Sequence, residues 1–389
     1  MNLKKRYYQL SKEEFTSYLS SLKNNPLSIV LYQDEKNYFF YYPEEEINKK
    51  IVLLHQKQWE LDSLFSSFSK LGKDQLIKSF LIHDILSTNA IEDIHSTSRD
   101  VFAILETANK SKDKELFFIV KAYQNMLQNK KIELNSFSDI RSLYDELIVP
   151  GINKKDIPNG QYFRKDPVYV SNGLESIHTG FYPEERILNG LSSFIRLIHQ
   201  NYDIYLKAIL SHFLFETIHP FYDGNGRLGR YIFSALLLQE TNSVFAFLIS
   251  SCIHKEKSKY YSALKAGEER LEFGLLNEYV NKRLTILSNG IESEIQVLKE
   301  SKEKIDFISY PPDFSESEKK VFFLLYESTI LSPFGIRNEE IRKESSISKR
   351  TLMYILKKLK EENKLIDTKL GRLTYHKVVN NSLCKEVNG

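Results

Sequence analysis

Apolar residues recur at intervals of three and four, rather than two, through roughly residues 50–300, and this spacing constrains the fold more than any other feature of the sequence. The clearest stretch follows Asp203, a residue type that is common at helix N-caps. Its apolar positions are Leu206, Ile209, Leu210, Phe213, Leu214, Phe215 and Ile218. They cover two faces of the expected helix, so we predict a core helix, buried on most sides, within a mainly α fold.

Length and composition narrow the class of protein. A chain of 389 residues, 42% apolar and 27% charged, is long enough for two or three domains and for a real core. Its net charge of +3, from 54 basic and 51 acidic residues, neither requires nor excludes a polyanionic partner. Cys252 and Cys384 are too few and too far apart for a disulfide framework or a cysteine zinc site. Because we find no secretory signal and no apolar run near the roughly 18 residues of a membrane span, we predict a cytoplasmic protein.

Two regions interrupt the helical pattern. Residues 166–183 alternate as a strand does and contain Asn172-Gly173, a pair that favours tight hairpin turns because both residues tolerate positive φ. We therefore predict a β-hairpin that stands out of a helical domain. Residues 1–50 contain two β-prone runs, at 29–32 and 38–42, and we interpret this region as an N-terminal cover.

One segment carries most of the chemistry, and it reads His219-Pro220-Phe221-Tyr222-Asp223-Gly224-Asn225-Gly226-Arg227-Leu228-Gly229-Arg230. Pro220 should end the buried helix just after His219, which places the imidazole at a helix C-terminus with access to a cleft. The Gly-Asn-Gly run can adopt backbone conformations closed to other residues and can point successive N–H groups at an anion. Helical spacing resumes at Leu228, so this phosphate-binding turn adjoins a helix N-terminus.

Charged residues of the same segment complete the site. Arg227 and Arg230 lie three apart, so they project from the same side of the first helical turn and can bind phosphoryl oxygens bidentately. Asp223 is the one carboxylate, and a hard divalent ion that bridges phosphates suits such an oxygen ligand. The pattern predicts a site for a triphosphate and a metal beside the general base His219.

The segment fills the signature HPFx(D/E)GNGRxxR of the Fic family without a departure, so the chain resembles Fic proteins. Most Fic proteins are adenylyltransferases, which move AMP from ATP to a Ser, Thr or Tyr hydroxyl of a target protein or of themselves. The resemblance implies that His219 takes the hydroxyl proton, that Phe221 anchors the loop and that Asp223 binds Mg²⁺. It further implies ATP contacts from Gly224, Asn225, Gly226, Arg227, Leu228, Gly229 and Arg230. The hairpin at 166–183 takes the place of the Fic flap, which holds the target segment as an added strand.

A second part of the resemblance lies upstream. Thr88 and Glu92 match the first two defined positions of the Fic inhibitory motif (S/T)xxxE(G/N), whereas Asp93 departs from its Gly or Asn. In the family this glutamate pairs with the second motif arginine, here Arg230, and denies it to the γ-phosphate. Two anions that bind the same guanidinium repel each other, so binding of one disfavours binding of the other. The resemblance therefore implies the class with an N-terminal inhibitory helix, over about residues 77–95, and a resting enzyme that Glu92 inhibits.

The adenine end of the site is marked only by Tyr260 and Tyr261. They fall where related proteins carry a paired tyrosine after the motif helix, so the resemblance implies that one ring lines the base pocket. Core packing is the competing role. We favour it for each ring, because the chain contains 23 tyrosines and most serve packing.

The C-terminal part forms a separate module. Pro311-Pro312 ends the long helical pattern because prolines lack the N–H donor, so we expect a domain boundary at 309–313. Asn338 and Ser348 should cap two short helices, before strands near 365–366 and 373–375. This order resembles a winged helix-turn-helix.

Two uses of this module remain open. It can bind DNA phosphates through basic residues of the second helix and the wing, namely Lys349, Arg350, Lys357, Lys369 and Arg372. It can also be a protein-docking or dimer module with a solvated basic face, and we slightly favour this second use.

We therefore predict three regions: an N-terminal Fic-associated region (1–110), a helical Fic catalytic core with a β-hairpin flap (111–305) and a small winged-helix domain (313–380). The expected activity is Mg²⁺-dependent AMP transfer from ATP to protein hydroxyls. A nucleotide-sensing, DNA-binding regulator is an alternative of another class, although phosphate sensing alone needs no general base. A Fic enzyme that transfers UMP or phosphate, or that removes AMP, is a third.

Overall fold

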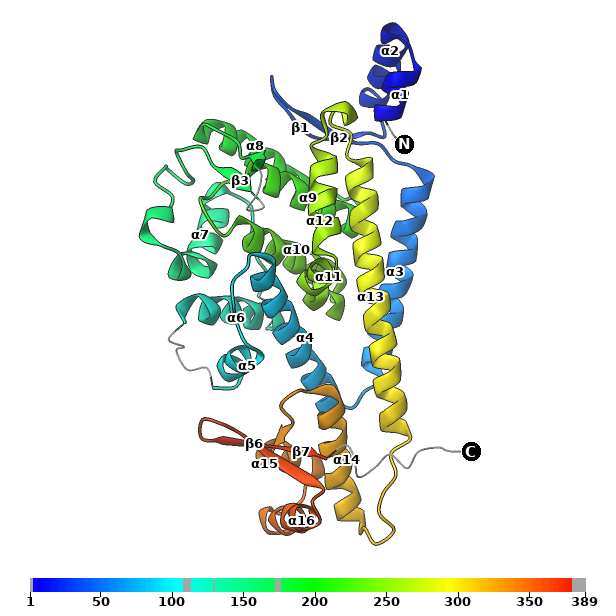
Figure 1. Cartoon of the computed structure of the whole chain (residues 1–389), viewed down its shortest axis with the longest axis vertical. Coiled ribbons are helices and arrows are strands. Elements are labelled where there is room, and N and C mark those ends of the chain that lie inside the picture. Colours follow the sequence, from blue (N-terminus) through cyan, green and yellow to red (C-terminus); the bar gives the residue numbers. More distant parts are fainter. Residues whose placement is uncertain (1–2, 108–112, 129, 172–175, 380–389) are drawn as a thin grey trace. The chain divides into compact units, whose positions relative to one another are not determined.

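The computed structural model describes residues 3–107, 113–128, 130–171 and 176–379, and its fold is mainly helical (Figure 1). The chain forms two compact units. Unit 1 comprises the residues up to Trp59 together with His83–Glu292, and unit 2 comprises Glu60–Ile82 together with the residues from Ser293 onward. Neither unit is one continuous stretch of chain, whereas the three predicted regions (1–110, 111–305 and 313–380) are each continuous, and their bounds stay a prediction. Of the helices described, none is both long and apolar enough to cross a bilayer.

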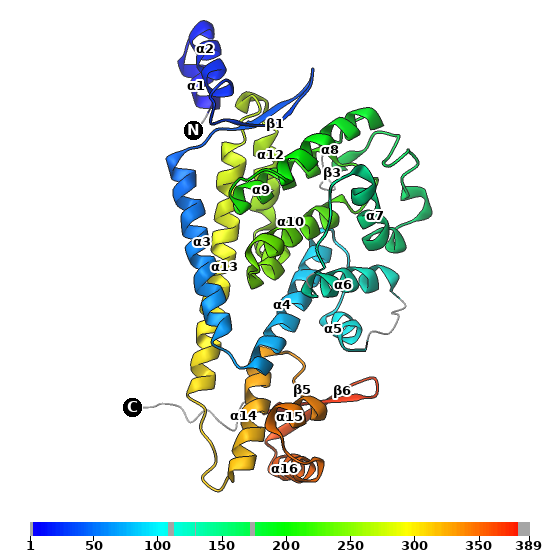
Figure 2. The ribbon, with the colours of Figure 1, turned by 180° about the vertical axis from the view of Figure 1, so that it is seen from behind.

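Three long helices contribute residues to both units. They are α3 (Glu45–Ser66), α4 (Lys70–Ile91) and α13 (Asn277–Asp306). Within unit 1, α3 and α13 lie side by side in both views (Figures 1 and 2), and Lys50 Nζ donates to Asn281 Oδ1 over 2.5 Å. The boundary between the units therefore falls inside regular helices.

The predicted core helix is α9 (Ile204–Ile218), and every residue in it except Glu216 is buried. Asp203 is its N-cap, with a side chain that accepts from the backbone N–H groups of Tyr205 and Leu206. Helix α9 packs against α8 (Glu184–Ile198) and α10 (Asn225–Thr241), which lie next to it in Figures 1 and 2. The prediction of a helix buried on most sides is confirmed.

The rest of unit 1 surrounds these helices. Its remaining elements are α1 (Leu3–Gln9), α2 (Lys12–Lys23), β1 (Ile29–Gln33), β2 (Tyr38–Tyr41), α5 (Ser98–Thr107), α6 (Lys114–Leu127), α7 (Phe137–Leu147), β3 (Tyr169–Ser171), β4 (Ser176–Thr179), α11 (Ile249–Lys255), α12 (Lys257–Gly267) and short 3₁₀ turns. The β-prone runs of the N-terminal region form the antiparallel pair β1–β2. Strands β3 and β4 form the predicted hairpin, also antiparallel, while the Asn172-Gly173 turn lies outside the described residues.

Unit 2 contains the C-terminal module. Its elements are α14 (Glu316–Leu331), β5 (Ile336–Arg337), α15 (Asn338–Ser345), α16 (Lys349–Glu361), β6 (Leu365–Leu370) and β7 (Leu373–Val378). The strands form an antiparallel sheet in the order β5-β7-β6. Ser348 caps α16 as predicted, but α15 already begins at Asn338, whose neighbour Arg337 is the N-cap; Glu340 accepts from the Arg337 N–H over 3.0 Å.

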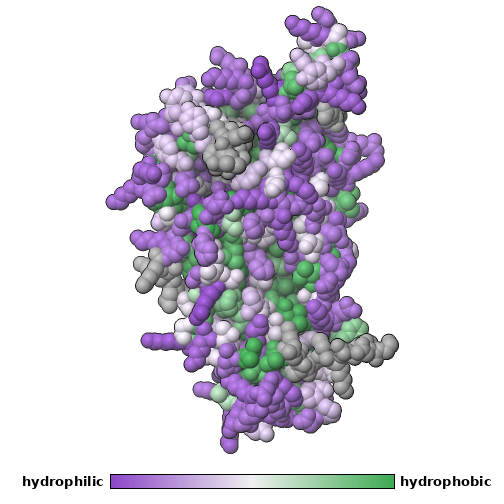
Figure 3. Space-filling view, viewed as in Figure 1, coloured by the Kyte–Doolittle hydropathy of each residue, from purple (hydrophilic) through white to green (hydrophobic). Residues whose placement is uncertain are grey.

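The core of unit 2 is apolar and its surface is charged. Val321, Phe322 and Leu325 of α14 pack with Ile355 and Leu359 of α16. Hydrophilic residues predominate on the face in Figure 3, in keeping with a chain that is 27% charged. Of the two cysteines, Cys252 is buried and is not in a disulfide, and Cys384 lies outside the described residues.

Candidate active site

His219 terminates the core helix α9. It is the C-cap residue, with φ 52° and ψ 63° in the left-handed region, and its N–H donates to the Phe215 carbonyl over 3.0 Å. Pro220 follows and cannot continue the helix. The imidazole is partly exposed, with Nδ1 3.3 Å from the carbonyl oxygen of Glu216. The structure thus places His219 at a helix C-terminus with access to solvent.

The turn after His219 is held by the side chain of Asn225. Its amide accepts from the Phe221 N–H (3.0 Å) and donates to the Phe221 carbonyl (2.9 Å). Phe221 is fully buried and its ring stacks on Tyr144, with centroids 3.6 Å apart. The Tyr144 hydroxyl in turn donates to the Asp223 carbonyl over 3.1 Å. Asn225 and Phe221 therefore shape the turn, which leaves the backbone N–H of Asn225 as the group that can face a ligand.

Residues 224–227, at the N-terminus of α10, form a turn with the geometry that an anion requires, and we call it the anion-binding turn. Gly224 has φ 77°, a conformation that favours glycine, and its N–H donates to Asp223 Oδ1 over 2.6 Å. The first bond inside the helix runs from the Leu228 N–H to the Gly224 carbonyl (3.0 Å). The N–H groups of Asn225, Gly226 and Arg227 precede this bond, so the helix itself gives them no acceptor. Such groups bind anions at helix N-termini.

Two residues of the expected ATP set face elsewhere. Leu228 is fully buried, and its N–H is already bonded to Gly224. A Cβ on Gly229 would lie 2.6 Å from Glu216 Oε1 and 3.3 Å from His212, so Gly229 allows α10 to approach α9. Helix packing therefore uses both positions, and their contact with ATP stays a prediction.

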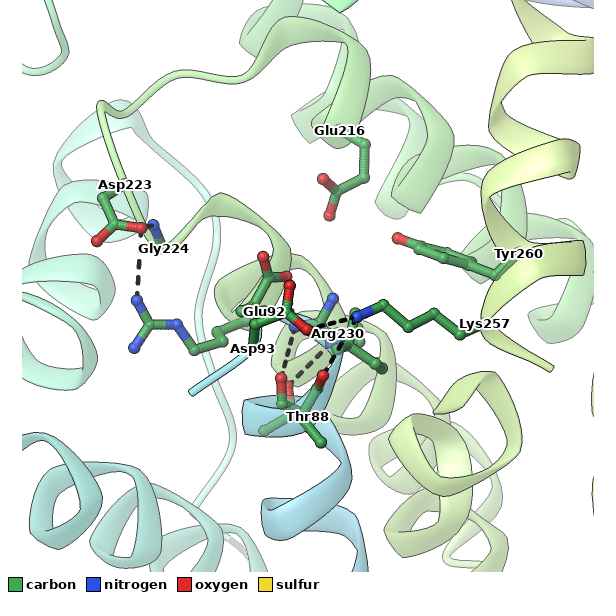
Figure 4. A network of polar contacts seen from close by, with 12 residues as sticks. Thr88, Glu92, Asp93, Glu216, Asp223, Gly224, Arg230, Lys257 and Tyr260 are labelled. Carbon is green, nitrogen blue, oxygen red and sulfur yellow. Dashed lines mark hydrogen bonds and ion pairs between the residues drawn. The ribbon is translucent and has the colours of Figure 1, made fainter. Parts of the chain in front are cut away.

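Glu92 lies on the anion-binding turn (Figure 4). A Cβ added to Gly226 would come within 2.2 Å of Glu92 Oε1, so the absence of a side chain there admits the carboxylate. Arg230, 1% exposed, donates from Nη2 to Glu92 Oε1 over 2.8 Å. Its Nε also donates to Thr88 Oγ1 over 2.9 Å. The structure thus brings Thr88 and Glu92 to Arg230, which lies 142 and 138 positions from them along the chain.

The charges around Glu92 explain its ionisation. Burial opposes the charged form, but Arg230, then Arg227 and His219, outweigh it and lower the pKa of Glu92. Burial likewise disfavours the Arg230 cation, yet the Glu92 carboxylate raises the pKa of Arg230 overall. About a third of the Glu92 side chain, 34%, remains exposed, so a competing anion can reach the position that this carboxylate occupies.

Arg227 has a carboxylate partner of its own. It is 3% exposed and pairs with Glu115, in the first turn of α6, while its Nη2 lies 3.6 Å from Asp223 Oδ1. Burial lowers the pKa of Arg227 to about 10, so the guanidinium stays charged at neutral pH. Sequence reasoning missed Glu115, because an acidic residue just after the N-cap Asp113 is an ordinary helix feature.

The end of α4 is held by α12. Helix α4 ends at Ile91, short of the expected limit near 95, and Asp93 adopts φ 58°. Lys257 Nζ donates to the Ala90 carbonyl (3.3 Å) and to Asp93 Oδ1 (3.0 Å). The Tyr261 hydroxyl donates to the Ile91 carbonyl over 3.4 Å. Asp93 thus takes the left-handed conformation that glycine or asparagine takes more readily, and Lys257, which sequence reasoning missed, binds it.

Tyr260 is a core residue. It is 2% exposed, its hydroxyl lies 3.1 Å from His212 Nε2, and Arg283 lies over its ring at 4.8 Å. Burial, together with the cations Arg283 and Arg230, holds the pKa of His212 well below its usual range, so His212 is neutral. Tyr260 therefore packs in the core, the role that the sequence analysis favours, and its contact with adenine stays a prediction. Tyr261 is partly exposed and contacts the end of α4 instead.

Asp223 is the residue of the turn that fits a divalent cation. Its side chain is 54% exposed beside the anion-binding turn. Partial burial and the nearby Glu92 carboxylate raise the pKa of Asp223. Among the described residues, no group of three His, Cys, Asp or Glu side chains could hold a metal by itself. A single accessible carboxylate suits Mg²⁺, which keeps several waters and takes further oxygens from phosphates.

Comparison with known proteins finds a family match that includes His219 to Arg230 but not Thr88 or Glu92. Residues 134–237 match the model of the Fic/DOC family. Over 155 residues, or 38% of this chain, the sequence is 34% identical to a probable protein adenylyltransferase of Aquifex aeolicus (strain VF5), and the match spans only 40% of that protein. The fold is similar to the crystal structure of a Fic family protein from Desulfovibrio desulfuricans G20. That likeness has a TM-score of 0.54 and 16% identity, and it covers 90% of this chain and 99% of the other.

Proposed function

We propose that this protein is an adenylyltransferase that uses ATP and Mg²⁺ to attach AMP to a Ser, Thr or Tyr hydroxyl of a protein, and that Glu92 inhibits it at rest. One observation carries the proposal. The carboxylate of Glu92 accepts from Arg230 Nη2 over 2.8 Å and lies against Gly226, at the N-terminus of α10 and a few residues after His219. A phosphate group carries the same sign of charge and needs the same donors.

The residues suggest how AMP transfer proceeds. The target hydroxyl oxygen attacks the α-phosphorus, a new O–P bond forms, and the bond from phosphorus to the bridging oxygen breaks to release pyrophosphate. The hydroxyl proton passes to the imidazole of His219, which acts as general base. The N–H groups of Asn225, Gly226 and Arg227, with the guanidinium of Arg230, stabilise negative charge on the phosphates. Asp223 would hold Mg²⁺, which supplies charge neutralisation of the phosphates when bound.

Inhibition follows from competition for one position. Glu92 Oε1 bonds to Arg230 and lies against Gly226, so a phosphate oxygen cannot take the same place until the carboxylate moves. The ion pair is reinforced because Thr88 accepts from the Arg230 Nε. The nucleotide would therefore bind weakly or in a poor geometry in the resting protein, and loss of Glu92 would release the site.

A labelling experiment tests the activity. Purified Glu92→Gly protein is incubated with Mg²⁺ and ATP labelled at either the α- or the γ-phosphate, and covalent label on protein is measured. We expect α-label on the protein, with wild type labelled more slowly. Label from the γ position would indicate phosphoryl transfer instead, and label only from UTP would indicate UMP transfer. Release of AMP from modified protein by wild type would indicate de-AMPylation.

A second candidate function concerns the C-terminal module. Tyr354 and Met353 of α16 are 67% and 50% exposed. Three lysines of α16 are paired within unit 2: Lys357 with Glu361 (3.7 Å), Lys358 with Glu318 (2.9 Å) and Lys360 with Asp367 (2.5 Å). Exposed aromatic surface with internally paired charge favours a protein partner over a DNA backbone. We propose that α16 docks a protein, and a second copy of the chain is the first partner to test.

Two measurements separate these uses. Sedimentation velocity should show dimers that Tyr354→Ser weakens, whereas Lys357→Ala, on the same face, should leave them unchanged. Fluorescence anisotropy with a labelled DNA duplex tests the alternative. Salt-dependent binding that is lost in Lys349→Ala and Arg350→Ala, with a monomeric wild type, would establish the DNA-binding regulator instead.

A further inference from the structure

Arg164 is a fully buried arginine that binds main chain rather than a carboxylate. Its exposure is 0%, and it lies in the described stretch just before the hairpin β3–β4. Among the described residues, no acidic side chain forms an ion pair with it. Its partners are carbonyl oxygens: those of His219 (Nε, 2.8 Å), Asp166 (Nη1, 2.7 Å), Phe181 (Nη2, 2.8 Å) and Ile218 (Nη2, 3.4 Å).

Three of the groups that residue 164 binds belong to the turn that carries the general base. The Arg164 side chain donates to the carbonyls of Ile218 and His219, and the Arg164 backbone N–H donates to the carbonyl of Pro220 over 3.2 Å. These carbonyls lie at the C-terminus of α9, where the last turn of a helix leaves its acceptors without intrahelical donors. A buried cation is favourable there because the helix dipole is negative at this end.

The other two carbonyls flank the hairpin, one on each arm. Asp166 precedes β3 and Phe181 follows β4. The backbone reinforces the link, since the Gly180 N–H donates to Val168 (3.1 Å) and the Phe181 N–H donates to Ile218 (2.9 Å). One guanidinium therefore joins both arms of the hairpin to the His219 turn.

The local chain is built around this guanidinium. A Cβ on Gly180 would lie only 2.4 Å from Arg164 Nη2 and 3.0 Å from the His219 Cβ, so Gly180 admits the side chain. Burial lowers the pKa of Arg164 to about 10, which still leaves it charged at neutral pH. A lysine could not replace it, because an ammonium has three donors on one atom and cannot span carbonyls on opposite sides.

We propose that Arg164 is a positioning residue that fixes the backbone of His219 relative to the β3–β4 hairpin, so that a hydroxyl presented along the hairpin meets the imidazole. This inference rests on the proposed function, in which the hairpin holds the target segment. The anion-binding turn is held separately, by Asn225 and Gly224. Loss of Arg164 should therefore impair transfer without impairing nucleotide binding.

The kinetic test uses Arg164→Lys in the Glu92→Gly background, with transfer of α-label measured against ATP concentration. Displacement of a catalytic group by about 1 Å can cost on the order of 100-fold in rate. We expect a loss of about that size at saturating ATP, while the ATP concentration for half-maximal rate changes less than about threefold. Gly180→Ala, which pushes on the same guanidinium from the other side, should lower the rate in the same manner.

The matched control is Arg186→Lys. Arg186 also contacts Phe181, through its ring at 4.0 Å, and pairs with Asp34 at 2.7 Å, but it does not bond to the His219 turn. This variant should keep the parent rate. Transfer by Arg164→Lys within threefold of the parent would overturn the proposal, and so would a loss of rate matched by an equal loss of ATP affinity.

Hydrogen exchange tests the same link without catalysis. The Phe181 amide, bonded to Ile218, should lose protection in Arg164→Lys and keep it in Arg186→Lys. Equal protection in both variants would refute the positioning role. If Glu92→Gly transfers no label at all, the proposed function fails, whereas the exchange result still decides whether Arg164 joins the hairpin to the His219 turn.

Discussion

The anion-binding turn of unit 1 and the α16 surface of unit 2 both concentrate charge, but they hold it in different ways. Arg230 is 1% exposed and takes its carboxylate from Glu92, 138 positions away along the chain. Lys360, whose side chain is 44% exposed, forms an ion pair with Asp367, which is only seven positions away along the chain. Arg227 repeats the first pattern with Glu115.

The difference teaches where a change in charge should matter. Removing one partner of a buried ion pair is strongly destabilising, so an anion that binds Arg230 has to replace the Glu92 carboxylate. Exposed pairs between neighbours contribute about 0–1 kcal/mol and are weakened by salt. We therefore expect changes around the anion-binding turn to alter activity by orders of magnitude, and changes in unit 2 to alter only local stability.

The largest effect should come from His219→Ala. The variant removes the expected proton acceptor, and general-base catalysis is typically worth 10² to 10⁴ in rate. ATP affinity should stay near that of the parent, because the N–H groups of α10 and the guanidinium of Arg230 are untouched. The measurement is label transfer and calorimetric ATP binding in the Glu92→Gly background.

His199→Ala is the matched control for this experiment. His199 is likewise the C-cap of its helix, α8, but it lies in an exposed position where Nε2 contacts Asn135. It should transfer at the parent rate. Undiminished transfer by His219→Ala would refute the assignment of the general base.

The next effect concerns the carboxylate at the turn. Glu92→Ala should bind ATP about tenfold more tightly, which corresponds to about 1.4 kcal/mol, because the nucleotide no longer displaces an ion pair. Asp93→Asn serves as control, since Asp93 is the adjacent acid, its side chain is 89% exposed and it does not bond to Arg230. Calorimetry with Mg²⁺ and ATP measures both. Equal affinities in Glu92→Ala and wild type would show that the two anions do not compete.

The contrast between the regions also explains what the sequence could predict. Helix α9, its cap Asp203 and the hairpin strands follow from local patterns, and their prediction is confirmed. The contact between Glu92 and Arg230 was accessible only through a family resemblance. The sequence around Glu115 and Arg164 does not indicate their roles, because their partners are distant in sequence and come near only in the folded chain.

Tyr260 and Leu228 show that a motif position can also serve the core, because both side chains are buried. A family motif suggests a role in ligand binding for each of its positions, but some of these side chains pack between helices. Tyr260 is one of 23 tyrosines, and its contact with His212 depends on how α12 packs against α9. The division into units was equally hidden, because it falls within α3, α4 and α13 rather than at the prolines near 311.

A smaller effect should follow from Lys257→Met. Lys257 binds the last turn of α4 through the Ala90 carbonyl and Asp93, and its side chain is 33% exposed. Its loss should loosen the segment that carries Glu92 and raise label transfer about twofold to fivefold, since such partly exposed contacts are each worth about 0.5–1 kcal/mol. Lys259→Met is the control, because Lys259 pairs with Glu256 instead. If Lys257→Met transfers label at the wild-type rate, Lys257 does not help to hold Glu92 in place, and the contacts with Arg230 and Thr88 suffice.

The smallest effect should appear in unit 2, at the N-cap of α14. Glu318 accepts from Lys358 Nζ (2.9 Å) and from the Ser315 N–H (2.7 Å). These bonds lower the pKa of Glu318 to about 2 from its ordinary 4.5, so the stability they contribute is present above pH 4.5 and is lost as the pH falls toward 2.

Glu318→Gln should reduce the hydrogen-exchange protection of α14 roughly fivefold at pH 6, or about 1 kcal/mol, and by less at pH 3. Glu316→Gln, in the same turn but with its side chain 84% exposed, should change little at either pH. If the difference between Glu318→Gln and wild type were as large at pH 3 as at pH 6, the charge of Glu318 would not be its source, and the contrast with the buried carboxylate pairs of unit 1 would narrow.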